Sequence, residues 1–427
     1  MRRTFSIAAA VAAVWALLAA PSPSDAEEFF FKDGDTVVMI GDSITEQHLY
    51  SNYVEMWTTT RFPAWKLTFR NTGIGGDRST GGNGRFARDV AFFKPTAMTV
   101  DFGMNDGGYR DFEENGFRTY MGGLQGMADQ AKKANIRAAW CTPQPLDGGE
   151  PGQTALTGYN KTLEKYGEGV KQIADKNGGL FVDQFHPYLA VLDKARQAGP
   201  TYNRITAGDA VHPGPPGQAL MAASILKGLS FPALVSSVEI DAAAAKGDGK
   251  NATVSGVAAK DGGVTFQRLD QGLPFFPEQA MPILPHAPLL DELNRYTLKV
   301  TGLKAGKYEV KLGGTKVAEY TAEELAKGVN LAGPALKAGP VAEQVKAIVA
   351  AIENKNRFHH DRIFRGIHLS NAQIPDWLEL KLSPAEIEEK KQAALKKRYE
   401  ELGKLDEAVR QTLPIKPHQV DVVPIKA

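Results

Sequence analysis

The sequence predicts an α/β fold with a doubly wound, largely parallel, five-stranded sheet, because short apolar runs alternate with amphipathic stretches between residues 36 and 229. Strand–helix alternation of this kind implies right-handed crossovers. The expected strands are almost continuously apolar, as in sheets covered on both faces: Thr36–Ile40, Trp65–Asn71, Thr96–Phe102, Ile136–Cys141 and Leu180–Asp183. The clearest expected helix carries an apolar stripe at helical spacing: Leu156, Tyr159, Leu163, Tyr166, Val170 and Ile173.

Length and composition restrict the classes of protein that fit. The 427 residues allow two or three domains, and 43% hydrophobic with 23% charged residues is ordinary globular usage. The formal net charge of +1 gives no basic excess for neutralising phosphates, so no nucleic-acid partner is expected. Cys141 is the only cysteine, which excludes an intramolecular disulfide and a cysteine-rich zinc site.

The N-terminus has the pattern of an export signal. Arg2 and Arg3 precede an apolar run over residues 7–20, and Ser24 and Ala26 have the small-residue spacing that a signal peptidase needs. We therefore expect a signal peptide at residues 1–26, with a secreted or periplasmic mature chain. The paired arginines are compatible with twin-arginine export and are also common in ordinary signals. No later segment is apolar enough to span a membrane.

The pattern changes after Phe231, which suggests a catalytic domain at residues 27–231, a small β-rich accessory module at 232–320 and a helical region at 321–427. The module is expected to be antiparallel. Its strands Tyr296–Val300 and Lys307–Leu312 alternate across the turn Gly302–Gly306, and Gly313-Gly314 forms a second turn before Lys316–Tyr320.

Two capping boxes start the helices of the C-terminal region. Thr321 has Glu324 at the required spacing, and Ser383 has Glu386, with Pro384 at the first helical position. The second box opens a long charged helix that should run to about Leu413. Its apolar side is expected to contain Ile387, Leu395, Leu402 and Val409.

Polar residues follow the ends of three successive strands. Ser43, in Gly41-Asp42-Ser43, should lie near a helix N-terminus, where it is either a nucleophile or a helix cap. Gly76 and Asn105 follow the second and third strands, each in a sequence typical of turns. In open α/β sheets, however, ligands bind at the carboxyl ends of the strands, which favours one shared site.

A base for such a site is present before the last helix of the domain. Asp209 stands three residues ahead of His212, and Pro213 keeps His212 out of helical geometry. His48 and His186 have no carboxylate at useful local spacing and are interpreted as surface or core histidines. The segment of His359, His360, Asp361 and His368 is interpreted as a solvated charged face, and no metal or cofactor is expected.

These residues resemble the four conserved blocks of the SGNH, or GDSL, hydrolases. Gly41-Asp42-Ser43 is similar to the nucleophile block, Gly76 to the second, Gly103-x-Asn105-Asp106 to the third and Asp209-x-x-His212 to the last. The resemblance covers residues 33 to about 230. It implies a flavodoxin-like SGNH sheet, a serine esterase with catalytic Ser43, His212 and Asp209, and an oxyanion hole formed by Ser43, Gly76 and Asn105.

The expected activity is hydrolysis of esters, and the first expected substrate is an O-acetyl group on carbohydrate. Asp77, Arg78, Asp106 and Tyr109 are the residues expected to line the substrate site. Alternatives are a lipid or aryl esterase or lysophospholipase of the same fold, an acyltransferase to a sugar, and a polysaccharide-binding protein whose hydrolase domain is weakly active. The partner would be a small-molecule or polysaccharide ester, without nucleic acid or a membrane span.

Overall fold

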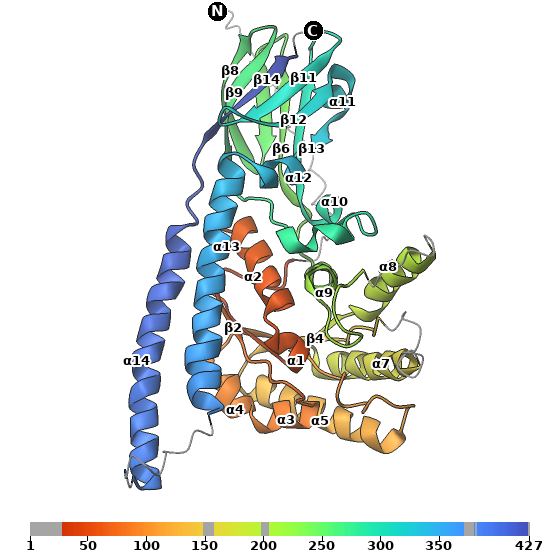
Figure 1. The fold of residues 1–427 in the computed structure, drawn as a ribbon, viewed down its shortest axis with the longest axis vertical. Coiled ribbons are helices and arrows are strands. Elements are labelled where there is room, and N and C mark those ends of the chain that lie inside the picture. The colour runs from red at the N-terminus through yellow and green to blue at the C-terminus, as the bar shows by residue number, and fades with distance from the viewer. Residues whose placement is uncertain (1–27, 148–157, 198–204, 371–379, 381, 426–427) are drawn as a thin grey trace, which may run out of the picture.

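The computed structural model describes residues 28–147, 158–197, 205–370, 380 and 382–425. The expected signal peptide and Leu156 lie outside these ranges. An α/β domain occupies one end of the molecule and a β-sandwich the other, and two long helices run beside the α/β domain (Figure 1).

The α/β domain is built on one parallel sheet, as predicted. Its strands run in the order β2-β1-β3-β4-β5, and every neighbouring pair is parallel. This is the order of flavodoxin-like sheets. The strands are β1 (Thr36–Gly41), β2 (Thr68–Asn71), β3 (Ala97–Asp101), β4 (Arg137–Cys141) and β5 (Leu180–Val182).

Helices cover both faces of this sheet, because alternate residues of β1 belong to different apolar cores. Val37 and Met39 pack into one core, and Val38 and Ile40 pack into the other. The first core receives α2 (Leu49–Arg61), α8 (Phe185–Gln197) and α9 (Pro215–Gly228); the second receives α4 (Phe86–Asp89), α5 (Glu114–Lys133) and α7 (Tyr159–Asn177). Three short elements complete the domain: α1 (Ser43–Glu46), α3 (Ser79–Gly84) and η1 (Ala91–Phe93).

The β-sandwich has two sheets, ordered β13-β10-β6-β7 and β12-β11-β14-β9-β8. Their strands are β6 (Leu234–Asp241), β7 (Lys246–Lys250), β8 (Ala252–Lys260), β9 (Gly263–Asp270), β10 (Arg295–Thr301), β11 (Lys307–Leu312), β12 (Thr315–Thr321), β13 (Val329–Asn330) and β14 (His418–Pro424). Short helices connect them: η2 (Glu278–Ile283), α10 (Leu289–Leu293), α11 (Ala322–Lys327) and α12 (Ala332–Lys337).

The strand pairing of the sandwich differs from simple sequence order. The expected turn at Gly313-Gly314 joins the antiparallel pair β11 and β12. In contrast, β10 and β11 lie in different sheets, and β10 pairs in parallel with β6. Alternation shows which face of a strand is buried but does not identify its partner. The last described strand also belongs to the sandwich, since β14 inserts between β9 and β11.

Both predicted capping boxes are present, at Thr321 and Ser383. The second starts α14 (Pro384–Gln411), whose apolar positions Leu395, Leu402 and Val409 are buried. Ile387 was expected on the same side but is 46% exposed, because this first part of the helix extends beyond its packing partners.

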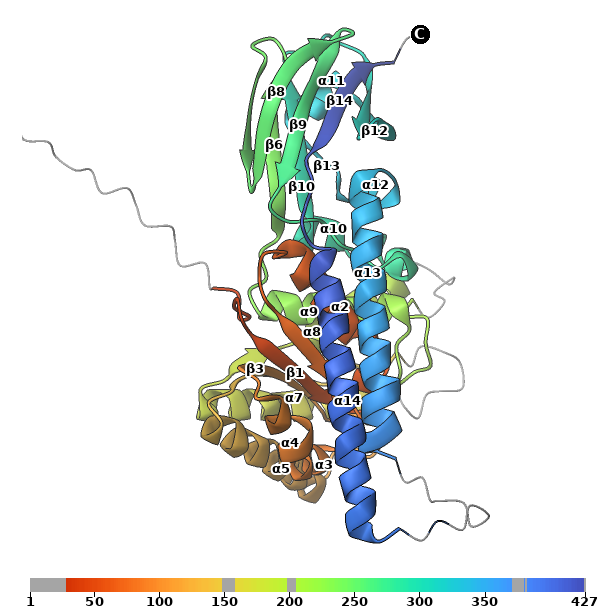
Figure 2. The same cartoon turned by 90° about the vertical axis from the view of Figure 1, so that its left-hand side faces the viewer.

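Buried polar contacts join the C-terminal helices to the α/β domain. In α13 (Pro340–Phe358), Lys355 forms an ion pair with Glu55 of α2, and their side chains are 2% and 5% exposed. Asn356 donates to the other Glu55 oxygen at 2.8 Å. Asp406 of α14 forms an ion pair of 2.6 Å with Arg70 of β2. Figure 2 shows both helices side by side along the domain.

Removing one partner of such a pair leaves an uncompensated buried charge, which typically costs about 3–5 kcal/mol. The C-terminal helices are therefore held firmly on the α/β domain. Among the described helices, none combines the length and apolarity needed to cross a bilayer.

Candidate active site

Ser43 is the first residue of α1, directly after the carboxyl end of β1. The cap of this helix is Asp42, whose Oδ1 accepts a hydrogen bond of 2.9 Å from the Ile44 backbone N–H. The Ser43 hydroxyl is therefore not needed as the cap. The hypothesis that Ser43 caps this helix is therefore wrong, since the adjacent aspartate fulfils the capping role.

The residues predicted as a base and its partner meet this hydroxyl. Ser43 Oγ lies 2.9 Å from His212 Nε2, and His212 Nδ1 lies 3.0 Å from Asp209 Oδ2. A carboxylate only accepts hydrogen bonds, so the imidazole proton belongs on Nδ1. The lone pair on Nε2 then faces the serine hydroxyl, which is the arrangement that a general base needs.

The loop around His212 is closed by local hydrogen bonds. Asp209 Oδ1 accepts from the backbone N–H groups of Val211 and His212 at 2.8 and 2.6 Å. Although partial burial opposes the charged form, these bonds and the His212 side chain lower the pKa of Asp209, so it is ionised at neutral pH. A side chain at Gly208 would meet the His212 carbonyl at 2.0 Å, so only glycine permits this closure.

Glutamine side chains tie this loop to the nucleophile segment. Gln218 of α9 is buried, accepts from the Tyr50 backbone N–H at 3.0 Å and donates to Gln47 Oε1 at 2.7 Å. Gln47 in turn lies 3.5 Å from the Pro213 carbonyl. Because Gln47 closely follows Ser43 and Pro213 follows His212, these contacts fix the separation between hydroxyl and imidazole.

The predicted oxyanion donors lie at the ends of three strands. The Ser43 N–H is at the first position of a helix, where no intrahelical acceptor exists. Gly76 follows β2 with a positive φ of 74°. Within the described ranges, neither backbone N–H has a hydrogen-bond acceptor. These two groups are thus available to a ligand.

Asn105 follows β3 and is held in one orientation by three neighbours. Its Nδ2 donates to the Asp77 carbonyl at 3.0 Å and to Asp42 Oδ2 at 3.3 Å. Its Oδ1 accepts from the Tyr109 hydroxyl at 3.0 Å. Tyr109 adopts a left-handed backbone with φ of 58°, a conformation that costs about 1 kcal/mol or more in a non-glycine residue. The amide donor of Asn105 is therefore preorganised.

The four residues expected to line a substrate site have different environments. Asp77 Oδ2 accepts from Arg85 at 2.7 Å, and Asp106 Oδ1 accepts from the Ser79 hydroxyl at 2.7 Å. Both carboxylates thus already make structural bonds. Arg78 and Tyr109 are exposed. Their contact with substrate stays a prediction.

Arg85 is a structural residue of the site that the sequence did not reveal. Its buried guanidinium donates to the Gly41 and Thr72 carbonyls at 3.0 and 2.6 Å, and it pairs with Asp77 and Asp89. It therefore joins the ends of β1 and β2 to the loop that carries Gly76. No local motif marks it, because its partners come from separate segments.

His186 corrects one expectation from the sequence. Its ring nitrogens contact Asp183 at 2.7 Å and Glu164 at 3.2 Å, so it does have acidic partners. His186 repeats the Asp-x-x-His spacing of His212. The described part of the chain contains no group of three or more metal-ligating side chains arranged to hold an ion.

Two buried carboxyl groups belong to the segment next to the nucleophile: Asp42 precedes Ser43, and Asp101 pairs with Gly41 across β1 and β3. Burial raises the pKa of Asp42 well above its ordinary value, and the Asp101 carboxyl raises it further. Burial likewise raises the pKa of Asp101, the last residue of β3, to about 7. A hydrogen bond of 3.0 Å from Gln184 has the opposite, smaller effect on this pKa. Both groups therefore resist ionisation, whereas Asp209 is ionised.

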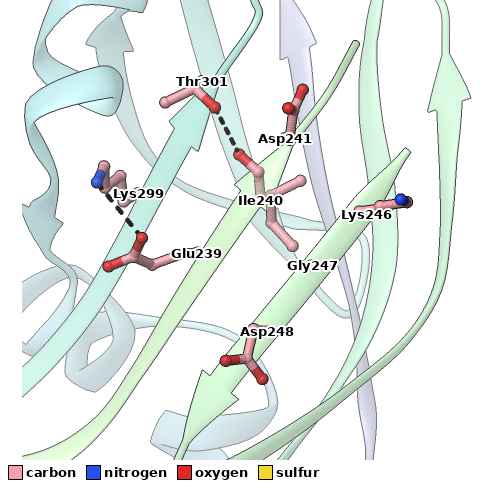
Figure 3. A pocket seen from close by; sticks show the side chains of 8 residues that line it. All are labelled: Glu239, Ile240, Asp241, Lys246, Gly247, Asp248, Lys299 and Thr301. Carbon is pink, nitrogen blue, oxygen red and sulfur yellow. Dashed lines mark hydrogen bonds and ion pairs between the residues drawn. The ribbon is translucent and has the colours of Figure 1, made fainter. Parts of the chain in front are cut away.

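Two pockets have linings that include none of the predicted catalytic or oxyanion-hole residues. Figure 3 shows one of about 320 Å³ on the sandwich, lined by side chains of β6, β7 and β10, in which Lys299 pairs with Glu239 at 3.3 Å. Its lining has no serine or histidine. A groove of about 510 Å³ runs between α2, α13 and the segment before η2, with an apolar lining that includes Leu49, Met56, Phe276, Val345 and Val349.

Comparisons with known proteins find relatives of the α/β domain. Residues 39–220 match the GDSL-like lipase/acylhydrolase family. An acetylxylan esterase from Geobacillus stearothermophilus is 25% identical over 220 residues, which are 46% of this chain and 95% of that protein. A solved structure of an acetylxylan esterase from the same organism is 24% identical, with a TM-score of 0.40. The match covers 47% of this chain and 96% of that one.

A second solved structure extends the likeness of fold to nearly the whole chain. It is described as a gut microbial diltiazem-metabolizing enzyme, is 23% identical and has a TM-score of 0.78. The match covers 92% of this chain and 98% of that one. The combination of α/β domain, sandwich and C-terminal helices therefore occurs together in another protein.

The buried Asp101 carboxyl predicts a pH-dependent stability. The unfolded chain releases this proton near the ordinary value of 3.8, whereas the folded chain retains it to about pH 7. The contribution of Asp101 to stability therefore falls as the pH rises from 4 to 7. We expect Asp101→Asn to be more stable than wild type at pH 8, by on the order of 4 kcal/mol, and similar at pH 4.

Thermal unfolding of both proteins from pH 4 to 8 measures this difference, and titrating groups that do not interact with Asp101 cancel in the comparison. A stability difference that is constant across the range would show that Asp101 does not titrate there.

Proposed function

Because residues 39–220 form a domain of the GDSL-like lipase/acylhydrolase family and the protein is a carboxylic ester hydrolase, we propose that it removes acetyl groups from carbohydrate through Ser43, His212 and Asp209. The observation that carries this proposal is the 2.9 Å separation of Ser43 Oγ and His212 Nε2, with Asp209 on the other ring nitrogen.

In the proposed mechanism, His212 Nε2 takes the hydroxyl proton as Ser43 Oγ attacks the ester carbonyl carbon. The ionised Asp209 holds the Nδ1 proton and stabilises the imidazolium. The tetrahedral intermediate then collapses, and His212 gives its proton to the leaving alcohol. Water, activated by the same imidazole, releases the acetate from Ser43 and restores the enzyme.

The oxyanion of the intermediate would be held by the backbone N–H groups of Ser43 and Gly76 and by Asn105 Nδ2. The weaker Asn105 bond, at 3.3 Å to Asp42, is the one that the oxyanion would replace. Each such donor contributes about 3–4 kcal/mol to transition-state stabilisation. Burial and nearby carboxyl groups raise the pKa of Asp42, which reduces the negative charge that faces the oxyanion.

Two observations support an acetylated carbohydrate as the substrate class. The curated relative named above is an acetylxylan esterase. The base and its partner are also open to solvent, since the side chains of His212 and Asp209 are 36% and 64% exposed. A polymer can reach such a site without entering an enclosed cavity.

A longer apolar acyl or aryl ester is the second candidate substrate. The groove between α2 and α13 has an apolar lining that suits such a chain, and Leu49 in that lining is six positions after Ser43 in the sequence. In that case the activity would rise with acyl chain length.

We also propose that residues 1–26 direct export and that the mature enzyme acts in the periplasm or outside the cell. The basic pair, apolar run and small residues before Glu27 support this. The exported protein is expected to begin at Glu27, which its intact mass measures. A full-length chain retained in the cytoplasm would contradict the proposal.

Ser43→Ala tests the chemistry and the substrate class together. We expect acetate release from acetylated xylan and related polysaccharides, and cleavage of p-nitrophenyl acetate, to fall by at least about 10⁴-fold. A fluorophosphonate probe should label wild type but not this variant. The control is Ser255→Ala, at an exposed position of β8, which should retain activity and labelling.

Undiminished activity in Ser43→Ala would refute the serine mechanism. A preference for long over acetyl chains in a series of p-nitrophenyl esters, without release of acetate from any polysaccharide, would favour the second candidate substrate.

A further inference from the structure

Glu46, at the end of α1, binds two different parts of the chain with its two carboxylate oxygens. Its Oε2 accepts a hydrogen bond of 2.7 Å from the Gly75 backbone N–H. Its Oε1 accepts from Arg365 Nε at 2.5 Å and lies 3.5 Å from His360 Nε2. The side chain is 11% exposed, so water competes little for these contacts. One carboxylate thus joins the nucleophile helix, the Gly76 loop and the C-terminal region.

The loop lies so close to α1 that position 73 has no room for a side chain. A side chain at Gly73 would meet the Glu46 backbone nitrogen at 2.4 Å, and one at Gly75 would meet Glu46 Oε2 at 3.0 Å. The N–H of Gly76 belongs to the next peptide unit. Because peptide units are planar, only the φ and ψ angles of Gly75 lie between the Gly75 nitrogen, which Glu46 holds, and the Gly76 nitrogen, the proposed oxyanion donor. Holding the first nitrogen therefore restricts the position of the second.

The residues that hold Glu46 come from an unusual helical segment. Arg365 and His360 belong to η3 (His359–His368), which continues α13 with π-helical geometry. Such geometry is rare and often occurs at functional sites. The buried Lys355–Glu55 pair lies in the turn of α13 just before this segment and fixes its position on α2.

The charge on Glu46 is maintained by these contacts. Partial burial opposes ionisation, but His360, Arg365 and the Gly75 N–H together lower the pKa of Glu46. His360 is itself oriented by Asp361, at 2.7 Å from its Nδ1, and by the His48 ring at 4.8 Å. An ionised carboxylate makes a stronger hydrogen bond to a backbone N–H than a neutral group does.

We propose that Glu46 is a positioning residue for the oxyanion hole and that Arg365 and His360 of the C-terminal region complete it. The inference rests on the function proposed above, in particular on the role of Gly76. It gives residues 340–368 a part in catalysis without contact to substrate. A displacement of a catalytic group by about 1 Å can cost 100-fold in rate, so this support is expected to act on turnover.

The test compares Glu46→Gln, Arg365→Ala and Arg365→Lys with wild type, using p-nitrophenyl acetate. We expect kcat to fall about 10- to 100-fold in Glu46→Gln and Arg365→Ala, with KM changed little, and Arg365→Lys to recover part of the loss. Arg365 is half exposed, so its truncation is not expected to unfold the chain. Circular dichroism at the assay temperature checks that each variant is folded.

A double variant tests whether the two residues act through one contact. Glu46→Gln with Arg365→Ala should lose no more turnover than Glu46→Gln alone, because both changes break the same link. The matched control is Arg362→Ala on the same helical segment. Arg362 is exposed, and no hydrogen bond or ion pair joins it to another described residue, so wild-type kcat is expected.

Three results would overturn the inference: wild-type kcat in Glu46→Gln and Arg365→Ala, a loss confined to KM, or an equal loss in Arg362→Ala. Asn105→Ala, which removes a proposed oxyanion donor directly, sets the scale of the effect. If Ser43→Ala is inactive while the Glu46 and Arg365 variants are normal, only this inference fails. If Ser43→Ala is active, the proposed function itself fails.

Discussion

The hydrogen bond between Ser43 Oγ and His212 Nε2, 2.9 Å long, joins residues 169 positions apart, and the geometry of the site depends on it. The parallel sheet makes this contact possible, because the carboxyl ends of β1, β2 and β3 meet at one edge. The last loop before α9 then returns to that edge. Gln218 and Gln47 hold the two segments at the separation that proton transfer requires.

The carboxyl groups near this contact differ in how readily they ionise, because their environments differ. Asp209 is exposed and receives two backbone N–H bonds, so it is ionised where it can stabilise a positive imidazole. Asp42 and Asp101 are buried and resist ionisation. Asp77 is compensated by Arg85. The positive charge expected on His212 therefore develops beside an ionised carboxylate, and the two buried carboxyl groups near Ser43 resist ionisation.

Much of the α/β domain could be predicted because its signals are local. Each expected strand was an apolar run, and each candidate residue followed such a run or carried a partner within a few positions. The Asp-x-x-His spacing was less decisive than it seemed, since Asp183 and His186 share it. What distinguishes His212 is the approach of Ser43, which depends on the complete fold.

The features that the sequence did not reveal depend on long-range pairing. β14 inserts into a sheet formed far earlier in the chain, and alternation of side chains cannot identify its neighbours. Arg85 connects the ends of two strands, and Arg365 reaches Glu46 across 319 positions. Such contacts leave no periodic pattern, although they support the residues that the motifs identify.

The most direct test of the account is a crystal structure of the enzyme after reaction with a small fluorophosphonate. We expect phosphorus bonded to Ser43 Oγ and its phosphoryl oxygen about 3 Å from the Ser43 and Gly76 backbone nitrogens and Asn105 Nδ2. His212 should remain beside the modified serine. A phosphoryl oxygen directed to solvent, or phosphorus bonded to another residue, would contradict the proposed convergence of nucleophile and donors.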